Sequence, residues 1–249
     1  KTYNLYEHIQ FATEISSAHF NEETKCWELR SVDGQQWCCQ FLVAAVGQLH
    51  RPFTPEIPGQ ATFNGPQFHS ACWQHDIDLT GKRVAVVGNA ASALQFIPPV
   101  AQTVAKLTVF QRGANWVIPK LDRPYRAWEQ WLSARIPLLA NYYRFSVWLR
   151  NELLIFPIMK GWRLHCRIGL WMHRRYISKH IKDPVLRAKL TPDYPMGAKR
   201  ILVSDDYYAA MARENVELEV GGITRLSEHG VVTPDGREIP ADVIIYGTG

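Results

Sequence analysis

The stretch VAVVGNAASALQF, residues 84–96, has the residue order of a phosphate-binding turn. A β-branched run ends at Gly88, small residues follow, and an apolar pattern with helical spacing resumes. A helix that begins just after a strand presents unpaired N–H groups and a partial positive charge, which suit a pyrophosphate. The candidate cofactor-binding residues of this turn are Gly88, Asn89, Ala90, Ser92 and Ala93.

The turn departs from the dinucleotide fingerprint G-x-G-x-x-G, because Gly88, Ala90 and Ala93 occupy the three glycine positions. Gly88 permits the tight turn. Ala90 puts a methyl group where the backbone approaches the phosphates, and Ala93 is a mild change at the position that packs the helix on the strand. Taken alone, these residues support a cofactor site and an ordinary turn between a strand and a helix about equally.

An arginine follows the next predicted strand, where the sequence reads VFQRG. NAD sites carry Asp or Glu near this point to hold the ribose hydroxyls. Here Arg112 occupies the place, and a guanidinium fork suits a 2′-phosphate. The residue therefore favours NADP over NAD, with a solvent-facing arginine as the alternative.

A second motif precedes the turn. FNGPQFHSACW, residues 63–73, matches F-x-G-x-x-x-H-x-x-x-W with Phe63, Gly65, His69 and Trp73. With this motif the chain resembles the Baeyer–Villiger monooxygenases, within the class of flavin-containing monooxygenases. The resemblance covers almost the whole chain, least clearly residues 126–180, and continues in order through VFQRGANWVIPKLDRPY, LTPDYPMGAKRILVSDDYY and DVIIYGTG.

The resemblance implies a flavoprotein that binds FAD and NADP and uses NADPH and O₂ to insert one oxygen beside a ketone carbonyl, giving an ester or lactone. In this family reduced flavin adds O₂ to form a peroxide. Arg200 in GAKR matches the flavin-side arginine and is the expected catalytic residue, because a fixed cation stabilises the peroxide anion and the adduct that follows. Lys199 is expected near the NADP phosphate.

The resemblance also assigns roles outside the turn. His69 lies where the chain passes between the FAD and NADP domains, and we expect it to couple their positions rather than transfer a proton. Trp73 is expected to be an apolar anchor. Gly47 and Gly247 each follow an apolar run and are further candidate cofactor-binding residues.

Three positions depart from the family pattern. Gln74 stands where Pro or Asp often occurs, Ala90 replaces the usual second glycine, and Gly113 replaces a common threonine. None removes the charge of Arg112, so NADP remains the expected nicotinamide cofactor. The chain lacks both an early G-x-G-x-x-G for FAD and an initiator Met, so we expect a fragment that alone does not form a complete FAD site.

These residues require elements to position them, and the pattern predicts an α/β fold with two Rossmann-like dinucleotide-binding domains and a helical insertion, as a partial chain. A strand, an Asp-Gly turn and an apolar run ending in Gly occur at both ends of the chain, which indicates two related domains.

The predicted division is 1–60 with 241–249 as a partial FAD-binding domain, 61–81 as an interdomain linker, 82–124 with 190–240 as the NADP-binding domain, and 125–189 as the insertion. The predicted strands include 11–19, 27–32, 41–47, 84–88 and 107–112, and the predicted helices include 91–105, several within 125–182, and one from Ser204 or Asp205 to Arg213.

Positive charge is concentrated in residues 120–200, which hold 17 Lys and Arg against five Asp and Glu, and five of the nine Trp. Such a segment can face an anionic cofactor or a membrane surface, or form solvated helices. The expected partners are a small ketone or heteroatom substrate and O₂, with weak peripheral membrane contact as one interpretation of the basic segment and no nucleic acid.

The five cysteines form no C-x-x-C pair, so we expect neither a disulfide framework nor a metal site, and we expect a reducing, cytoplasmic compartment. The missing C-x-x-C also disfavours an NADPH:disulfide reductase. Two alternatives stay open: a flavin monooxygenase that oxygenates N or S, and a catalytically silent nucleotide-binding module in which Ala90 marks decay of the turn.

Overall fold

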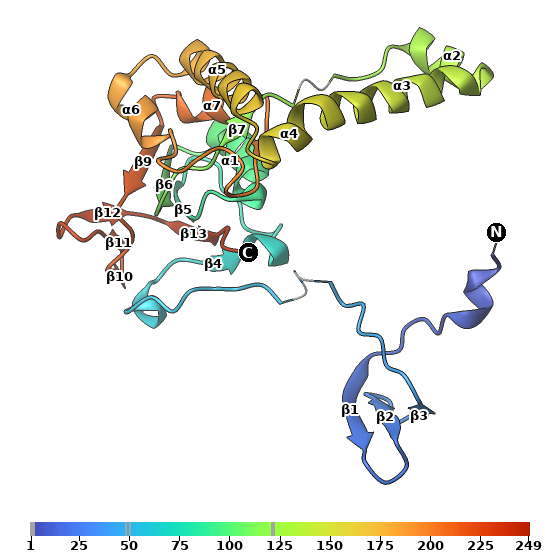
Figure 1. Ribbon diagram of the computed structural model, residues 1–249. Helices are drawn as coiled ribbons and strands as arrows, with labels where there is room; N and C mark the ends of the chain where they lie inside the picture. The colour runs from blue at the N-terminus through green and yellow to red at the C-terminus, as the bar shows by residue number, and fades with distance from the viewer. Residues whose placement is uncertain (1–2, 48, 50, 121–122) are drawn as a thin grey trace. The chain divides into compact units, whose positions relative to one another are not determined.

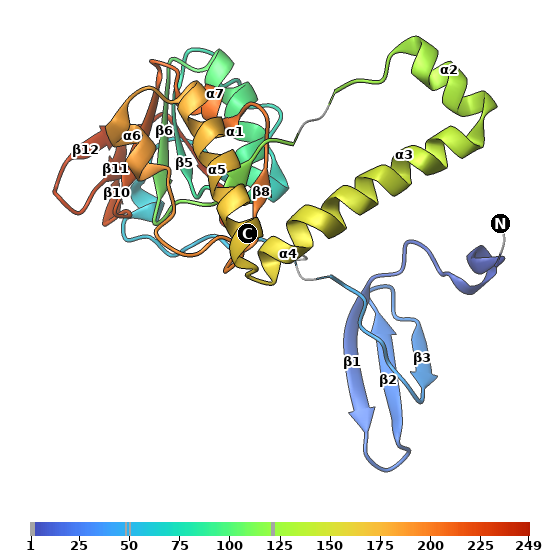
Figure 2. The same ribbon diagram turned by 45° about the horizontal axis from the view of Figure 1, so that its top comes forward.

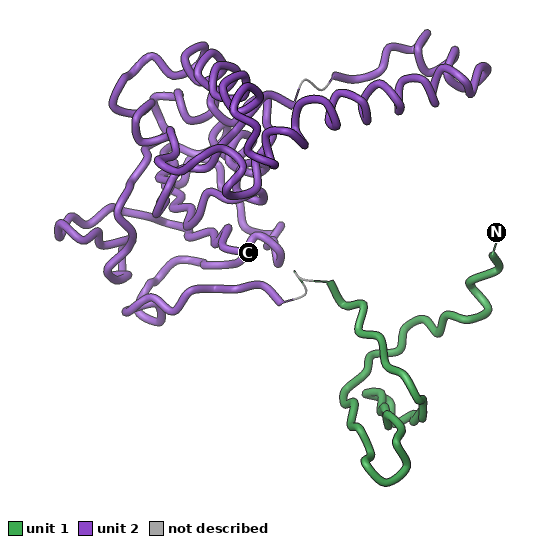
Figure 3. The backbone as a smooth tube through the Cα atoms, viewed as in Figure 1, with its two compact units in different colours: residues 1–50 green, residues 51–249 purple. Residues whose placement is uncertain are grey.

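The computed structural model describes residues 3–47, 49, 51–120 and 123–249 (Figure 1). The chain divides into two compact units, residues 1–50 and 51–249 (Figure 3). Each unit is described by itself below.

The first unit contains an antiparallel sheet of three strands, β1 (Ile15–Asn21), β2 (Cys26–Ser31) and β3 (Gln36–Cys39), after a short 3₁₀ helix, η1 (Leu5–His8). The predicted Asp-Gly turn joins β2 to β3, with Gly34 at φ +88°. The Ser31 hydroxyl closes this turn by accepting the Gln35 N–H at 2.9 Å. The predicted hairpin is therefore confirmed.

Residues 41–47 differ from the expectation of a buried strand. The structure gives them no regular element, and Phe41 and Val43 are each 84% exposed. A strand needs a neighbour to pair its backbone N–H and C=O groups, and none of the described residues pairs with this run. The prediction of a strand here is wrong because apolar residues alone do not supply that neighbour.

The second unit is built on a parallel sheet with the strand order β4–β13–β5–β6–β9. Figure 1 labels all five strands, and Figure 2 shows β5 beside β6. Its strands are β4 (Gln67–His69), β5 (Arg83–Val87), β6 (Lys106–Gln111), β9 (Val216–Val220) and β13 (Val243–Tyr246). The central strands are apolar almost throughout, which is expected of a sheet covered on both faces.

Alternate residues of these strands enter two different cores. Val84 and Val86 pack with helices α1 (Ala91–Thr103), α5 (Arg163–His180) and α7 (Tyr207–Met211). Ala85 and Ile244 pack on the other face, against a small antiparallel sheet. That sheet consists of β10 (Arg225–Ser227), β11 (Gly230–Val232) and β12 (Glu238–Pro240), and Figure 1 shows it opposite the helices.

The helical insertion leaves and rejoins this unit through a short parallel pair, β7 (Val117–Ile118) and β8 (Leu202–Val203). None of the described residues of α2 or α3 is buried, whereas α5 contributes to the core. The predicted helical character of 125–189 is confirmed, and its elements are α2 (Ala127–Arg135), α3 (Pro137–Arg150), a π-helical turn η4 (Asn151–Ile155), α4 (Phe156–Met159), α5 and α6 (Pro184–Lys189).

Two short 3₁₀ helices, η2 (Gln60–Thr62) and η3 (Ser70–Cys72), flank β4. The predicted helix near Ser204 is α7, and the Ser204 hydroxyl accepts the Tyr207 N–H at 3.1 Å. It ends at Met211, two residues before the predicted end. Throughout the described ranges, no helix combines the length and the apolar character needed to cross a membrane.

The position of β13 corrects one part of the predicted division. The sequence predicts that 241–249 share a domain with 1–60, but β13 lies between β4 and β5 in the sheet of the second unit. Its four residues are buried and need cover on both faces, which this place in the sheet supplies. β4, from the predicted linker 61–81, forms the edge of the same sheet. The cofactor assigned to each domain remains a prediction.

A charged pair joins the amino ends of β5 and β13. The Asp242 carboxylate accepts the backbone N–H of Arg83 at 2.7 Å and its guanidinium at 2.5 Å. Hydrogen bonds from the Arg83 side chain and then from its backbone lower the pKa of Asp242 to about 2. The carboxylate therefore stabilises the fold at neutral pH, and this contribution is lost as the pH falls from about 4 to about 2.

We predict that Asp242→Asn lowers the free energy of unfolding by about 1 kcal/mol at pH 7, less than the full shift implies because both side chains are partly exposed to solvent. At pH 2 the loss should be much smaller, since the wild-type carboxylate is then largely protonated. Urea unfolding followed by circular dichroism at both pH values measures the two losses. Losses of equal size would contradict the assignment.

Candidate functional site

The carboxyl ends of β5 and β13 form the point at which the sheet connections diverge. The chain leaves β5 through α1 to β6 on one side, while β13 lies on the other. Open α/β sheets bind ligands at such a point. There the Gly88 N–H donates to the Phe110 carbonyl at 2.9 Å, and the Gly247 N–H donates to the Val87 carbonyl at 2.8 Å.

Gly88 and Gly247 lie so close that a side chain does not fit between them. Gly88 has φ +105°, and a Cβ added to it would lie 2.6 Å from the Gly247 carbonyl oxygen. Ala93 lies directly beneath, fully buried, where a Cβ on Gly247 would be 3.2 Å from its methyl group. The predicted roles of Gly88 in the turn and Ala93 in helix–strand packing are consistent with these contacts.

The amino end of α1 is open. Ala90 is the N-cap residue with an ordinary φ of −80°; no side chain caps the helix, and no acidic residue lies in its first turn. Ala90 and Ser92 are exposed. The first-turn N–H groups therefore have no side-chain partner, and the positive end of the helix dipole faces outward.

Arg112 follows β6, the strand next to β5, and so lies at the same edge of the sheet. It is exposed, and its guanidinium makes no hydrogen bond or ion pair with any residue that the structure describes. Lys199 approaches the same loop, since its Nζ lies 4.5 Å from the centre of the Tyr194 ring, and the Tyr194 hydroxyl donates to the Ala114 carbonyl at 3.2 Å.

Arg200 is exposed and lies just before β8, whose Leu202 N–H donates to the Trp116 carbonyl at 2.8 Å. The structure does not bring its side chain against another predicted site residue among those described. Its catalytic role stays a prediction. Gly47, with φ +73°, belongs to the first unit, and its cofactor-binding role stays a prediction.

The residues of the F-x-G-x-x-x-H-x-x-x-W motif make packing contacts. Trp73 packs edge-on against Phe68 and against Phe96 of α1, with ring centres 5.3 and 5.5 Å apart. A Cβ on Gly65 would lie 2.2 Å from the Asp242 carbonyl oxygen, so this glycine permits a close backbone approach, and the ring of Phe63 lies beside it. These ring contacts are consistent with the expected role of Trp73 as an apolar anchor.

His69 ends β4 opposite Tyr246 of β13. Its Nδ1 accepts the Ala71 N–H at 3.1 Å, and burial lowers its pKa. The ring is therefore neutral near pH 7 and is held by a local backbone contact. This fits a structural role better than proton transfer, while the coupling between domains remains untested.

Sequence reasoning missed the polar side chains behind the turn. Gln111, at the end of the apolar run KLTVFQ, is 2% exposed, and Asn115 and Tyr194 hydrogen-bond nearby. Gln111 could have been found from the sequence, because it is a polar residue at the end of a predicted buried strand and buried amides need hydrogen-bond partners.

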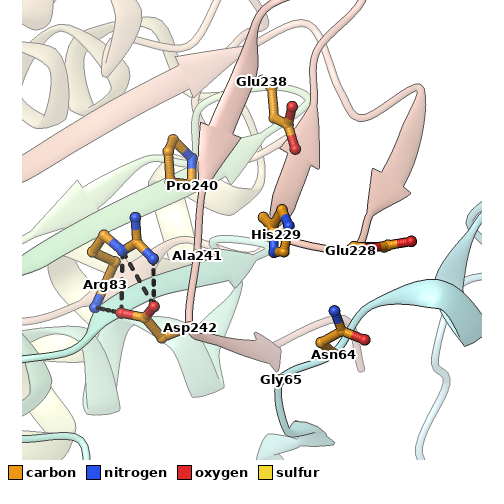
Figure 4. Close-up of a pocket in the computed structure, with 9 residues that line it drawn as sticks. All are labelled: Asn64, Gly65, Arg83, Glu228, His229, Glu238, Pro240, Ala241 and Asp242. Carbon is orange, nitrogen blue, oxygen red and sulfur yellow. Dashed lines mark hydrogen bonds and ion pairs between the residues drawn. The ribbon is translucent and has the colours of Figure 1, made fainter.

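A depression of about 580 Å³ lies at the opposite, amino edge of the sheet (Figure 4). It contains the Arg83–Asp242 pair and shares only Gly65 with the predicted site residues. Among the described residues, no three His, Cys, Asp or Glu side chains are arranged to hold a metal ion. The residues that line the depression are Asn64, Gly65, Arg83, Glu228, His229, Glu238, Pro240, Ala241 and Asp242.

The parallel sheet and its glycine turn place the second unit in the class of Rossmann-like α/β folds. The whole chain, residues 1–249, matches the family described as flavin-binding monooxygenase-like, and the chain belongs to that family. This confirms the family resemblance and the predicted fold class.

Relatives and solved structures agree with this assignment. The chain is 39% identical to a Baeyer–Villiger monooxygenase of Streptomyces coelicolor, covering 100% of this chain and 47% of the relative, and 39% identical to one of Pseudomonas aeruginosa, covering 99% and 47%. The open crystal structure of cyclohexanone monooxygenase matches with a TM-score of 0.80 at 27% identity, over 100% of this chain and 55% of that one. The chain thus spans about half the length of the curated relatives that it matches.

We predict that Gly88→Ala lowers the free energy of unfolding by about 1–3 kcal/mol, because alanine is strained at positive φ and its methyl group would meet Gly247. Gly113→Ala is the matched control, since Gly113 has no positive φ and an added Cβ meets nothing within 4 Å. Chemical unfolding of both variants compares them. Equal stability would show that the turn relaxes and that the close approach is not required.

Proposed function

We propose that the full-length protein is an FAD- and NADPH-dependent monooxygenase that converts ketones to esters or lactones. The observation that carries the proposal is the uncapped amino end of α1 beside the Gly88–Gly247 contact, with Arg112 just after the neighbouring strand β6 and without a partner among the described residues. A close-approach turn, open N–H groups and an exposed guanidinium together suit a nucleotide with a 2′-phosphate.

Solved relatives support both cofactors. A steroid monooxygenase described as bound to NADP matches with a TM-score of 0.80 at 29% identity, over 100% of this chain and 54% of that one. A structure described as OTEMO complexed with FAD and NADP matches with a TM-score of 0.78 at 28% identity. When bound, reduced FAD would supply the electrons that activate O₂.

Each part of the site has a distinct task in this proposal. The first-turn N–H groups of α1 bind the pyrophosphate of NADP, and Arg112 binds its 2′-phosphate. Lys199 adds positive charge beside the same loop. For FAD the chain offers Gly47 and Gly247, but Gly247 lies against Gly88 at the NADP turn.

We assign to Arg200 the stabilisation of the negative charge that develops as oxygen is transferred to the ketone carbonyl. Its guanidinium is exposed and engages no described residue, so it can contact substrate. Oxygenation at N or S relies less on such a cation, which separates the two reactions experimentally.

We predict that Arg112→Ala in the full-length protein weakens NADPH binding by about 1.5–3 kcal/mol, the range for a charged hydrogen bond, and leaves NADH binding little changed. Calorimetric titration of both nucleotides measures the two effects. Equal losses of affinity for NADPH and NADH would show that Arg112 does not bind the 2′-phosphate.

We predict that Arg200→Ala leaves FAD bound and the fold intact while ketone oxygenation falls by about 10²-fold, with NADPH oxidation releasing hydrogen peroxide instead. Arg200→Lys should restore activity only in part, since an ammonium lacks the planar fork. The measurement is ester formed per NADPH consumed, with a thioether as the comparison substrate. Unchanged ketone coupling would make Arg200 structural, whereas equal losses on both substrates would argue against its specific role at the ketone.

We also propose a cytoplasmic protein whose helical insertion contacts anionic membrane surfaces weakly. All five cysteines are free, which suits a reducing compartment. One side of α3, η4 and the first residue of α4 carries exposed apolar side chains at helical spacing, and the surrounding segment is basic. This stripe consists of Leu138, Tyr142, Phe145, Leu149, Leu153 and Phe156.

We predict that the full-length protein sediments with phosphatidylserine-containing vesicles at low salt, releases from them at high salt, and does not sediment with phosphatidylcholine alone. Phe145→Ser should weaken the association by removing apolar surface from the middle of the stripe. If no salt-sensitive sedimentation occurs, the membrane contact is contradicted, and these helices form a surface that faces solvent or is covered by protein.

A further inference from the structure

Side-chain hydrogen bonds join the turn after β5 to the loop after β6. The Asn89 Nδ2 donates to the Oε1 of Gln111 at 2.8 Å and to the Gly113 carbonyl at 2.9 Å. In return, the Asn115 Nδ2 donates to the backbone oxygen of Asn89 at 3.0 Å and to its Oδ1 at 3.2 Å. Two asparagines therefore bridge the turn that faces the pyrophosphate and the loop that begins with Arg112.

Further bonds hold this bridge from behind. The Nε2 of the buried Gln111 donates to the Lys189 carbonyl at 2.8 Å. The Tyr194 hydroxyl donates to the Ala114 carbonyl, and the Tyr194 carbonyl accepts the Trp116 indole N–H at 3.1 Å.

The Arg112 side chain has no fixed partner among the described residues, in contrast to this network. The backbone of residues 112–115 therefore sets the position of the Arg112 side chain. Asn89 fixes this backbone through a hydrogen bond to the Gly113 carbonyl, and Tyr194 fixes it through a hydrogen bond to the Ala114 carbonyl. Loss of the Asn89 amide would leave the Gly113 carbonyl and the Gln111 Oε1 without that donor, which favours rearrangement of the loop. A displacement of about 1 Å is enough to weaken a charged contact strongly.

We propose that Asn89 and Asn115 are positioning residues that set the preference for NADP over NAD by fixing the loop that carries Arg112. This inference rests on the proposed NADP site. NADP and NAD share the pyrophosphate and differ only in the 2′-phosphate. A residue that merely supports the fold or the turn would alter both affinities equally, whereas a residue acting through Arg112 alters their ratio.

The test is a double-mutant cycle on the full-length protein, with NADP⁺ and NAD⁺ binding measured by calorimetry. Asn89→Ala and Asn115→Ala should each reduce the ratio of the two affinities by about fivefold, within the range for residues coupled through a backbone shift. In an Arg112→Ala background, the same substitutions should leave the ratio unchanged, because no guanidinium remains to be positioned.

Asn215→Ala is the matched control. Its Nδ2 donates to the carbonyls of Ala101 and Val104 at 2.9 and 3.0 Å, at the far end of α1. It should lower stability as the other two substitutions do while leaving the nucleotide ratio unaltered. If Asn89→Ala does not fold, Asn115→Ala carries the test, since it leaves the bonds from Asn89 to Gln111 and Gly113 in place.

The outcomes separate this inference from the function on which it rests. If Arg112→Ala lowers the ratio but Asn89→Ala and Asn115→Ala weaken both nucleotides equally, the positioning role is overturned while the NADP site stands. If Arg112→Ala leaves the ratio unchanged, both the assignment of the 2′-phosphate and the inference fail. A ratio that still falls in the Arg112→Ala background would also overturn the inference.

Discussion

The close backbone approach of Gly88 and Gly247 is the constraint on which the rest of the second unit depends. It requires β13 to lie beside β5, with the two strands ending at the same level. The Arg83–Asp242 pair fixes the other ends of these strands. Because both ends are fixed, α1 begins at the divergence of the sheet with its N–H groups exposed. The geometry that we propose for phosphate binding is thus a consequence of how two strands that are distant in the sequence meet.

The local elements of this site could be predicted from the sequence. β-branched runs, small residues and helical spacing locate β5, α1 and β6 to within about two residues, as expected for strongly periodic segments. The Asp-Gly hairpin is equally local. The place of β13 could not be predicted in this way, because apolar alternation does not say which strand, far away in sequence, supplies the neighbour.

Local sequence patterns do not identify neighbours that are distant in the chain. This explains both the wrong prediction of a strand at 41–47 and why the hydrogen-bond network of Asn89, Gln111 and Asn115 was not predicted. The runs FLVAAVG and DVIIYG look alike, yet only the second has a described partner strand. Likewise, the sequence marks Asn89 as a candidate cofactor-binding residue of the turn and gives no sign that it bonds to Gln111, Gly113 and Asn115. The function of Asn89 and Asn115 as a bridge depends on the adjacency of β5 and β6 and on Tyr194, which the chain reaches only after the helical insertion.

The departure at Ala90 also has a physical interpretation. Its methyl group is exposed and its backbone φ is ordinary, so it neither strains the turn nor caps the helix. The open helix end is retained beside it, as is Arg112, whose side chain has no partner within the described ranges. These features support a functional nucleotide turn over a decayed one. The choice between ketone oxygenation and oxygenation at N or S depends instead on Arg200.

The most direct test of this account is a crystal structure of the full-length protein with NADP⁺. The account predicts pyrophosphate oxygens within hydrogen-bond distance of the first-turn N–H groups of α1, and the 2′-phosphate on the guanidinium of Arg112. A pyrophosphate bound away from the Gly88–Gly247 contact, or a 2′-phosphate that leaves Arg112 in solvent, would contradict it.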